Sequence, residues 1–127
     1  METDSGKQTR LFYFQDSDIP GGDLQGVSRA HWDTKGRRGP VRGGAMRVTT
    51  TKLKPGYLRK NGVPYSDNTG LVEYYDMVKE ANGDQLMVVT SVITDPMYLR
   101  EPFIISSHFK KQGSDAGWKP TACSSTW

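Results

Sequence analysis

Alternating apolar and polar positions dominate the chain and predict strands rather than helices. The clearest case is the segment 84–111, where two apolar, β-branched runs, Leu86–Ile93 and Phe103–Phe109, flank a corner between Asp95 and Pro102. Both runs are short and rich in Val, Ile, Thr and Phe, a composition that favours strands over helices. We therefore interpret them as two core strands of an antiparallel sheet.

Four other segments show the same composition or a period-two alternation. An Asn82-Gly83 pair between two such segments is typical of a β-hairpin and makes the strands on either side of it neighbours. We predict no helix of any length. The expected strands are Gln8–Gln15, Leu24–Trp32, Ala45–Leu53, Asn68–Lys79, Leu86–Ile93 and Phe103–Lys110. The predicted fold is all-β, an antiparallel meander of about six strands that forms a lipocalin-like half barrel or a small barrel.

The length of 127 residues, 35% of them hydrophobic, fits a single globular domain. We place this β domain at residues 8–111, after a disordered N-terminal segment at 1–7 and before a Gly/Ser/Pro tail at 112–127. No apolar run is long enough to cross a membrane. The residues after Met1 lack the basic start and apolar stretch of a signal peptide.

Few classes of chemistry leave a signature in this sequence. Cys123 is the only cysteine, which excludes an internal disulfide and a Cys-based zinc site. The chain has no nucleophile elbow, phosphate-binding loop, dinucleotide fingerprint or calcium loop, so we expect no cofactor and no metal. The net charge of +3 permits attraction to anionic surfaces without requiring it.

A long connection between the third and fourth strands is the first candidate site. It contains Tyr57, Arg59, Lys60 and Tyr65, and connections longer than a hairpin needs are often functional. In a binding site, the tyrosines would stack on a ring while Arg59 engages a carboxylate or phosphate. In the structural alternative, the two tyrosines close one end of the sheet.

The corner after the fifth strand is the second candidate. Asp95 stands before Pro96, a combination that favours a turn, and we expect its carboxylate to cap that turn. Tyr98 would help to close the barrel mouth, where it is also a candidate ligand or partner contact. The functional alternative makes Asp95 a general base beside a cavity.

The two histidines, His31 and His108, are placed on the second and sixth predicted strands. If these strands approach each other, the imidazoles could share a cavity with Glu73 or Asp95, which would suit acid–base chemistry or a metal site. Because the histidines lack the i, i+2 or i, i+4 spacing of paired ligands, we favour a surface or partly buried role for both.

The most basic stretch lies between the second and third strands. Lys35, Arg37, Arg38 and Arg42 could neutralise phosphates or another anionic surface. Aromatic residues that would stack on bases are absent from this stretch, so we favour a solvated loop or a protein contact over nucleic acid.

Several short motifs resemble a known group of sequences. They are GDLQG at 22–26, GGAMRVTT at 43–50, PGYLRKNGVPYS at 55–66, EYY at 73–75, TDPMYL at 94–99, PF at 102–103 and WKPTAC at 118–123. In this order they are similar to uncharacterised, usually secreted bacterial β-rich proteins with a GYLRKNG-type loop and an (E/D)DPxYLxxPF corner. The resemblance implies a periplasmic or extracellular domain, and the missing leader peptide leaves a cytoplasmic location as the alternative. It carries over no catalytic residue.

Two functional hypotheses follow, with a third beside them. The first is a non-catalytic extracytoplasmic module, such as an accessory subunit or a homo-oligomer, that binds a partner protein or a small apolar or aromatic ligand. Strands that are apolar on both faces favour a covering partner. The alternative is a small β-barrel lyase, isomerase or hydrolase that uses the histidines with a carboxylate. The third is a binder of anionic polymers through residues 35–47.

Overall fold

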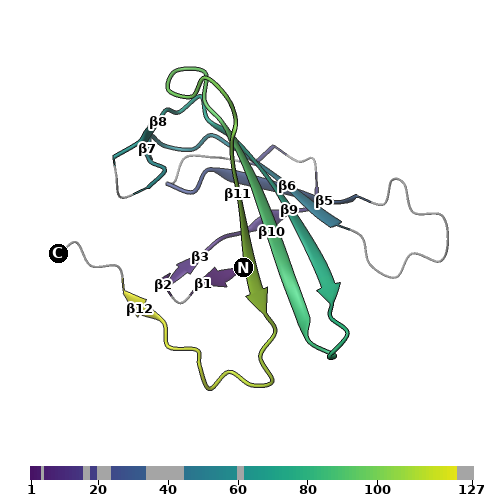
Figure 1. The fold of residues 1–127 in the computed structure, drawn as a ribbon. Coiled ribbons are helices and arrows are strands. Elements are labelled where there is room, and N and C mark those ends of the chain that lie inside the picture. Colours follow the sequence, from purple (N-terminus) through teal and green to yellow (C-terminus); the bar gives the residue numbers. More distant parts are fainter. Residues whose placement is uncertain (4, 16–17, 20–23, 34–44, 60–61, 123–127) are drawn as a thin grey trace.

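A computed structural model describes residues 1–3, 5–15, 18–19, 24–33, 45–59 and 62–122 (Figure 1). These residues contain no helix, and the predicted all-β class is confirmed. The main sheet has six strands in the order β11-β10-β9-β6-β5-β4. They are β4 (Phe12–Tyr13), β5 (Val27–Asp33), β6 (Ala45–Thr51), β9 (Gly70–Lys79), β10 (Gln85–Thr94) and β11 (Phe103–Lys110).

Three small two-stranded pairs accompany the main sheet. They are β1 (Glu2–Thr3) with β3 (Gln8–Thr9), β2 (Ser5–Gly6) with β12 (Thr121–Ala122), and β7 (Gly56–Tyr57) with β8 (Pro64–Tyr65). The segments that the sequence assigns to a disordered start and a tail therefore contain short strands, and β2 and β12 bring these segments together. Two-residue strands carry no period-two pattern that the sequence could reveal.

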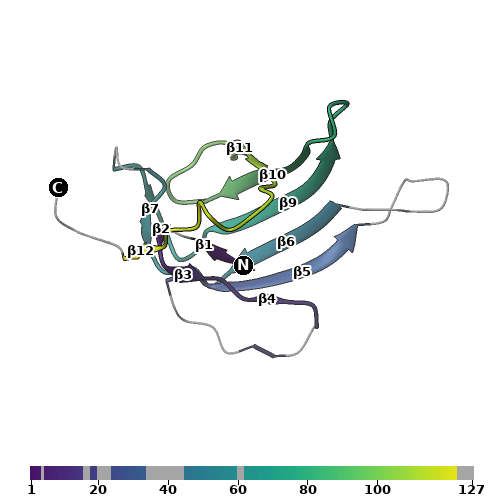
Figure 2. The same cartoon turned by 90° about the horizontal axis from the view of Figure 1, so that it is seen from below.

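The meander is antiparallel from β5 to β11, but its first step is not. β4 pairs with β5 in parallel, which corrects the expectation of a strictly antiparallel sheet. A parallel pair needs a connection of about a dozen residues, and residues 14–26 supply that length. The sheet is twisted and curved (Figures 1 and 2), but β11 and β4 lie at its two ends, so it does not close into a barrel.

One face of the sheet, which we call the inner face, carries the core. Ala30 pairs with Val48, and Tyr75 pairs with Val89, so the four side chains point to the same side of adjacent strands. All four are buried, and Val48 is fully inaccessible. Phe12, Met46 and Met87 pack against this cluster. Because side chains alternate along a strand, the residues between these positions lie on the opposite, outer face.

The N-terminal hairpin, formed by β1 and β3, lies against the inner face. Met1 and Arg10 bond to each other through their backbones at 2.8 and 2.9 Å, next to the β1–β3 pair. The Met1 sulfur lies 3.9 Å from the hydroxyl of Tyr75, and the Phe12 ring packs edge-on against Tyr75 with the centroids 5.7 Å apart. These contacts cover the core and bring Arg10 over the centre of the sheet.

The turn between β9 and β10 confirms the hairpin predicted at Asn82-Gly83. Glu80 and Asp84 close the loop through a 2.8 Å backbone bond, and Gly83 adopts a φ of 90°, which favours glycine. The Asn82 side chain accepts a 2.9 Å bond from the Asp84 backbone N–H. This tight turn fixes the register of the two longest strands.

Candidate functional site

A buried polar cluster occupies the inner face where Arg10 reaches the sheet. Arg10 Nη2 lies 2.6 Å from Glu73 Oε2 and donates a 2.6 Å bond to Thr50, while its Nε donates a 3.0 Å bond to Ser28. Ser28 and Thr50 bond to each other at 2.9 Å. Four strands or strand-flanking segments thus contribute one polar group each. A buried charge is costly without partners, and this network supplies the hydrogen-bond partners that the buried Arg10–Glu73 ion pair needs.

Tyr75 stands beside this cluster and is perturbed by it. The pKa of Tyr75 is raised to about 12, chiefly by burial. The nearby Glu73 carboxylate contributes to this rise, and its effect is larger than the opposing effect of the Arg10 guanidinium. The phenol is therefore held in its neutral form across the physiological range. Together with Tyr75, the cluster forms a polar surface under the N-terminal hairpin, which we call the polar floor.

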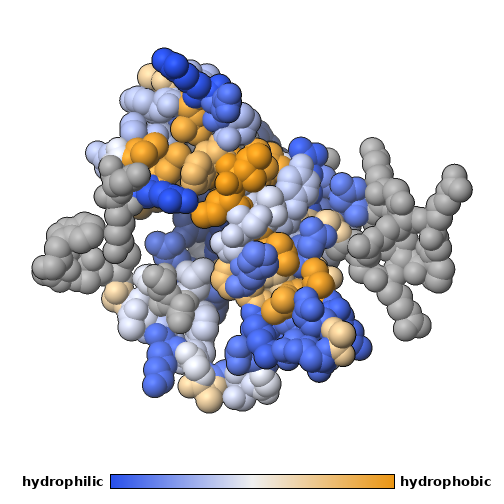
Figure 3. Space-filling model, in the orientation of Figure 1, coloured by the Kyte–Doolittle hydropathy of each residue, from blue (hydrophilic) through white to orange (hydrophobic). Residues whose placement is uncertain are grey.

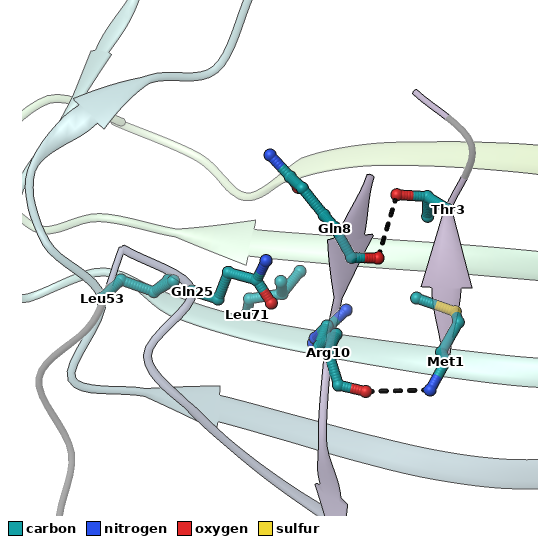
Figure 4. A pocket seen from close by; sticks show the side chains of 7 residues that line it. All are labelled: Met1, Thr3, Gln8, Arg10, Gln25, Leu53 and Leu71. Atoms are coloured by element: carbon teal, nitrogen blue, oxygen red, sulfur yellow. Dashed lines mark hydrogen bonds between the residues drawn. The ribbon is translucent and has the colours of Figure 1, made fainter. Parts of the chain in front are cut away.

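A cavity of about 260 Å³ opens next to this floor (Figure 4). Arg10 forms part of its wall, and the close-up shows Gln25 and Leu71 lying on the sheet side, opposite the hairpin. The seven residues that line it are Met1, Thr3, Gln8, Arg10, Gln25, Leu53 and Leu71.

A second cavity, of about 180 Å³, lies beneath the β7–β8 hairpin. It shares Leu53 and Leu71 with the first cavity, so these two leucines form a wall common to both. The remaining lining residues are Tyr57, Leu58, Tyr65, Thr69 and Ile93. Apart from Thr69 and the two phenol hydroxyls, these side chains present hydrocarbon, which suits an apolar or aromatic guest.

A close approach of backbone and ring holds this hairpin in shape. A Cβ at Gly56 would lie 2.8 Å from the Tyr65 hydroxyl oxygen, so the Tyr65 ring packs directly on the glycine backbone. Tyr57, the neighbour of Gly56, is 71% exposed at the cavity rim. Tyr65 thus forms a fixed wall and Tyr57 an open edge.

The structure brings some of the predicted loop residues together and separates others. Tyr57 and Tyr65 line one cavity, whereas Tyr98 is exposed at the corner and does not line it. The Arg59 guanidinium lies over the Phe103 ring, 5.1 Å from its centroid. Lys60 lies outside the described residues.

Asp95 is almost completely buried and heavily hydrogen-bonded. Its carboxylate accepts bonds from the backbone N–H of Ser66, from the Thr69 hydroxyl at 2.6 Å, and from the backbones of Met97 at 2.7 Å and Tyr98 at 3.0 Å. Burial acts to raise the pKa of Asp95, but these donors outweigh it and hold the pKa well below its usual range. This geometry supports the capping interpretation, since a general base works best with a pKa near the working pH.

The two histidines do not share a cavity. Because β6, β9 and β10 lie between β5 and β11, His31 and His108 are separated by three strands, about 19 Å at the usual strand spacing. Both are exposed, and both lie on the outer face, whereas Glu73 lies on the inner face and is paired with Arg10. The acid–base hypothesis required the strands of the two histidines to approach each other, and this requirement is not met. In the described ranges no three His, Cys, Asp or Glu side chains gather as a metal would need.

Sequence reasoning singled out Glu73 but missed its partner Arg10. The available signal was a glutamate between apolar neighbours on a core strand. The basic residues Lys35, Arg37, Arg38 and Arg42 lie outside the described part of the chain. Among the residues described, no helix has the length and apolar character that crossing a membrane requires.

No family model, curated protein or solved structure matches this chain. A function is therefore inferred from the geometry of the chain itself.

Proposed function

We propose that this protein is a non-catalytic binding module that takes a small apolar or aromatic ligand in the cavity beneath the β7–β8 hairpin. The observation that supports this proposal is the combination of an apolar hollow with the 71% exposed ring of Tyr57 at its rim. A large exposed aromatic side chain beside an apolar hollow is typical of a surface that binds something.

The size of the cavity limits the ligand. At about 180 Å³ the hollow is smaller than the sites that enclose drug-sized molecules, which start at roughly 300 Å³. It suits a single aromatic ring or a short branched alkyl group, with Tyr57 closing over it by stacking. The rigid Tyr65 wall would give shape selectivity, because Gly56 leaves that ring no room to retreat.

The surroundings favour a guest with an apolar body and one polar end. Thr69 places a hydroxyl in the lining, but that hydroxyl already donates to Asp95. The Tyr57 and Tyr65 hydroxyls are the remaining polar groups of the wall, and Arg10 lies beyond the shared leucines. An extracytoplasmic location belongs to the same proposal and is supported by the resemblance of the sequence motifs alone.

Titration with benzyl alcohol, a single aromatic ring with one polar end, followed by NMR chemical shifts, tests the site. We expect saturable shift changes in the wild type and a dissociation constant about tenfold weaker for Tyr57→Ala, because the stacking ring is lost. Tyr98→Ala is the matched control, since Tyr98 is also an exposed tyrosine, at 51%, but lies outside the cavity. Equal affinity of the two variants would overturn the assignment.

A further inference from the structure

The two edges of the main sheet differ sharply in how much backbone they leave open. At one end, β4 is a two-residue strand, too short to accept a long partner strand. At the other end, β11 pairs with β10 through eight consecutive residues, and no described strand lies on its other side. Figures 1 and 2 both show β11 as the last strand of the sheet.

The open edge of β11 lacks the devices that usually protect such strands. Residues 103–110 contain no proline, the pairing with β10 shows no bulge, and the sole charged side chain, Lys110, stands at the end and is paired with Asp84 at 2.7 Å. Ile104 is 62% exposed and Phe109 is 53% exposed. In Figure 3, orange apolar side chains lie among pale and blue polar ones where β10 and β11 run.

The hydrogen-bond pattern identifies which backbone groups face the open edge. The Lys111 N–H donates to the Gln85 carbonyl at 2.8 Å, so Lys111 and every second residue before it direct their backbone groups to β10. The alternate residues therefore direct N–H and C=O outward. Within the strand these are Ile104, Ser106, His108 and Lys110.

We propose that β11 pairs with β11 of a second copy of this chain, antiparallel and with Ser106 on the two-fold axis. Opposite residues in such a pair must share a face and must both direct their backbones outward at the bonded positions. The register centred on Ser106 satisfies both conditions, since it pairs Ile104 with His108 of the other copy. It also places the Pro102 carbonyl opposite the outward N–H of Lys110.

Side-chain complementarity selects this register over its neighbours. Phe103 comes to lie opposite Phe109 on the inner face, an aromatic cross-strand pair. Glu101 comes to lie opposite Lys111, which joins opposite charges at both ends of the interface. A shift of the centre to residue 107 would instead set Phe103 against Lys111. The assembly closes as a dimer, because the edges that remain are the short β4 strands. This proposal is independent of the ligand site.

Amide hydrogen exchange, measured at low and high protein concentration, reads the interface directly. In the dimer, we expect the outward amides of Ile104, Ser106 and His108 to become protected as concentration rises. The amides of Ile105 and Ser107, which bond to β10, should be protected at both concentrations and serve as the internal control. A dimer in which the outward amides stay unprotected would overturn the edge pairing, as would a protein that sediments as a monomer throughout.

Charge reversal tests the register. Glu101→Lys and Lys111→Glu should each weaken the dimer about tenfold by sedimentation equilibrium, because each creates two like-charge contacts. The double variant Glu101→Lys with Lys111→Glu restores both pairs and should regain wild-type affinity. Ser106→Lys, which sets two cations against each other across the axis, should give a folded monomer, with Ser114→Lys in the tail as control. Failure of the double variant to recover, or a dimeric Ser106→Lys, would refute the proposal.

Discussion

Arg10 and Glu73 form an ion pair of 2.6 Å between Nη2 and Oε2, although 63 residues separate them in the sequence. The side chains are 15% and 9% exposed, so both charges are largely withdrawn from water. The pair joins the N-terminal hairpin to the centre of β9 and completes the polar cluster with Ser28 and Thr50. The hairpin is thereby part of the folded core rather than an appendage.

Removing one partner of this pair should be far worse than removing both. We expect Glu73→Leu or Arg10→Met alone to lower the free energy of unfolding by about 3–5 kcal/mol, because a buried charge is left without its counter-ion. The double variant Arg10→Met with Glu73→Leu should cost less than the sum of the singles. Chemical denaturation of the four proteins gives this double-mutant cycle, and additive losses would show that the two charges do not interact.

Much of the sheet could be predicted from the sequence because its signals are local. β9, β10 and β11 follow the expected segments to within two residues, since β-branched runs and the Asn82-Gly83 turn determine them. The continuous first strand expected at Gln8–Gln15 is wrong: it splits into β3, which pairs with β1, and β4, which pairs with β5. The choice of pairing partner depends on tertiary packing, which no local pattern reports.

The candidate site was partly predictable for the same reason. Tyr57 and Tyr65 stood out because they flank turn signals in one long connection, and they line one cavity. Leu53, Leu71 and Ile93 complete that cavity from three separate segments, and nothing in their spacing indicates this. The histidine hypothesis depended on strand order, and a meander places β5 and β11 far apart.

Tyr75 should titrate later than an ordinary tyrosine. Its folded-state pKa, raised to about 12 from 10.0, lies above the unfolded value, so the folded protein holds this proton more tightly. The resulting contribution to stability is complete below pH 10 and is lost as the pH rises from 10 toward 12. Denaturation midpoints across this range should fall more for the wild type than for Tyr75→Phe. Identical pH profiles would contradict the assignment, and the tyrosinate absorbance of the two proteins provides an independent titration.

Asp95 should have the opposite effect on the pH dependence of stability, which it should lower in acid. Its folded-state pKa is lowered, so its contribution to stability is complete above the usual value of 3.8 and is lost as the pH falls below it. We expect Asp95→Asn to lower the melting temperature by several degrees at neutral pH, since the amide cannot replace all four accepted bonds. The same variant should show a shallower loss of stability between neutral and acid pH. Asp67→Asn, at an exposed position in the loop between β8 and β9, is the matched control and should follow the wild type.

Two glycines with positive φ should respond differently to a methyl group. Gly83, with a φ of 90°, has no atom within 4 Å of the position that a Cβ would take, so Gly83→Ala should cost about 1 kcal/mol from backbone strain alone. At Gly26, with a φ of 64°, a Cβ would collide with the Thr51 carbonyl oxygen. Because that oxygen belongs to the backbone at the end of β6, Gly26→Ala must displace one of two paired strands. In urea denaturation, we expect Gly26→Ala to lower the free energy of unfolding at least twice as much as Gly83→Ala. Equal losses would mean that the end of the β5–β6 pair shifts without cost.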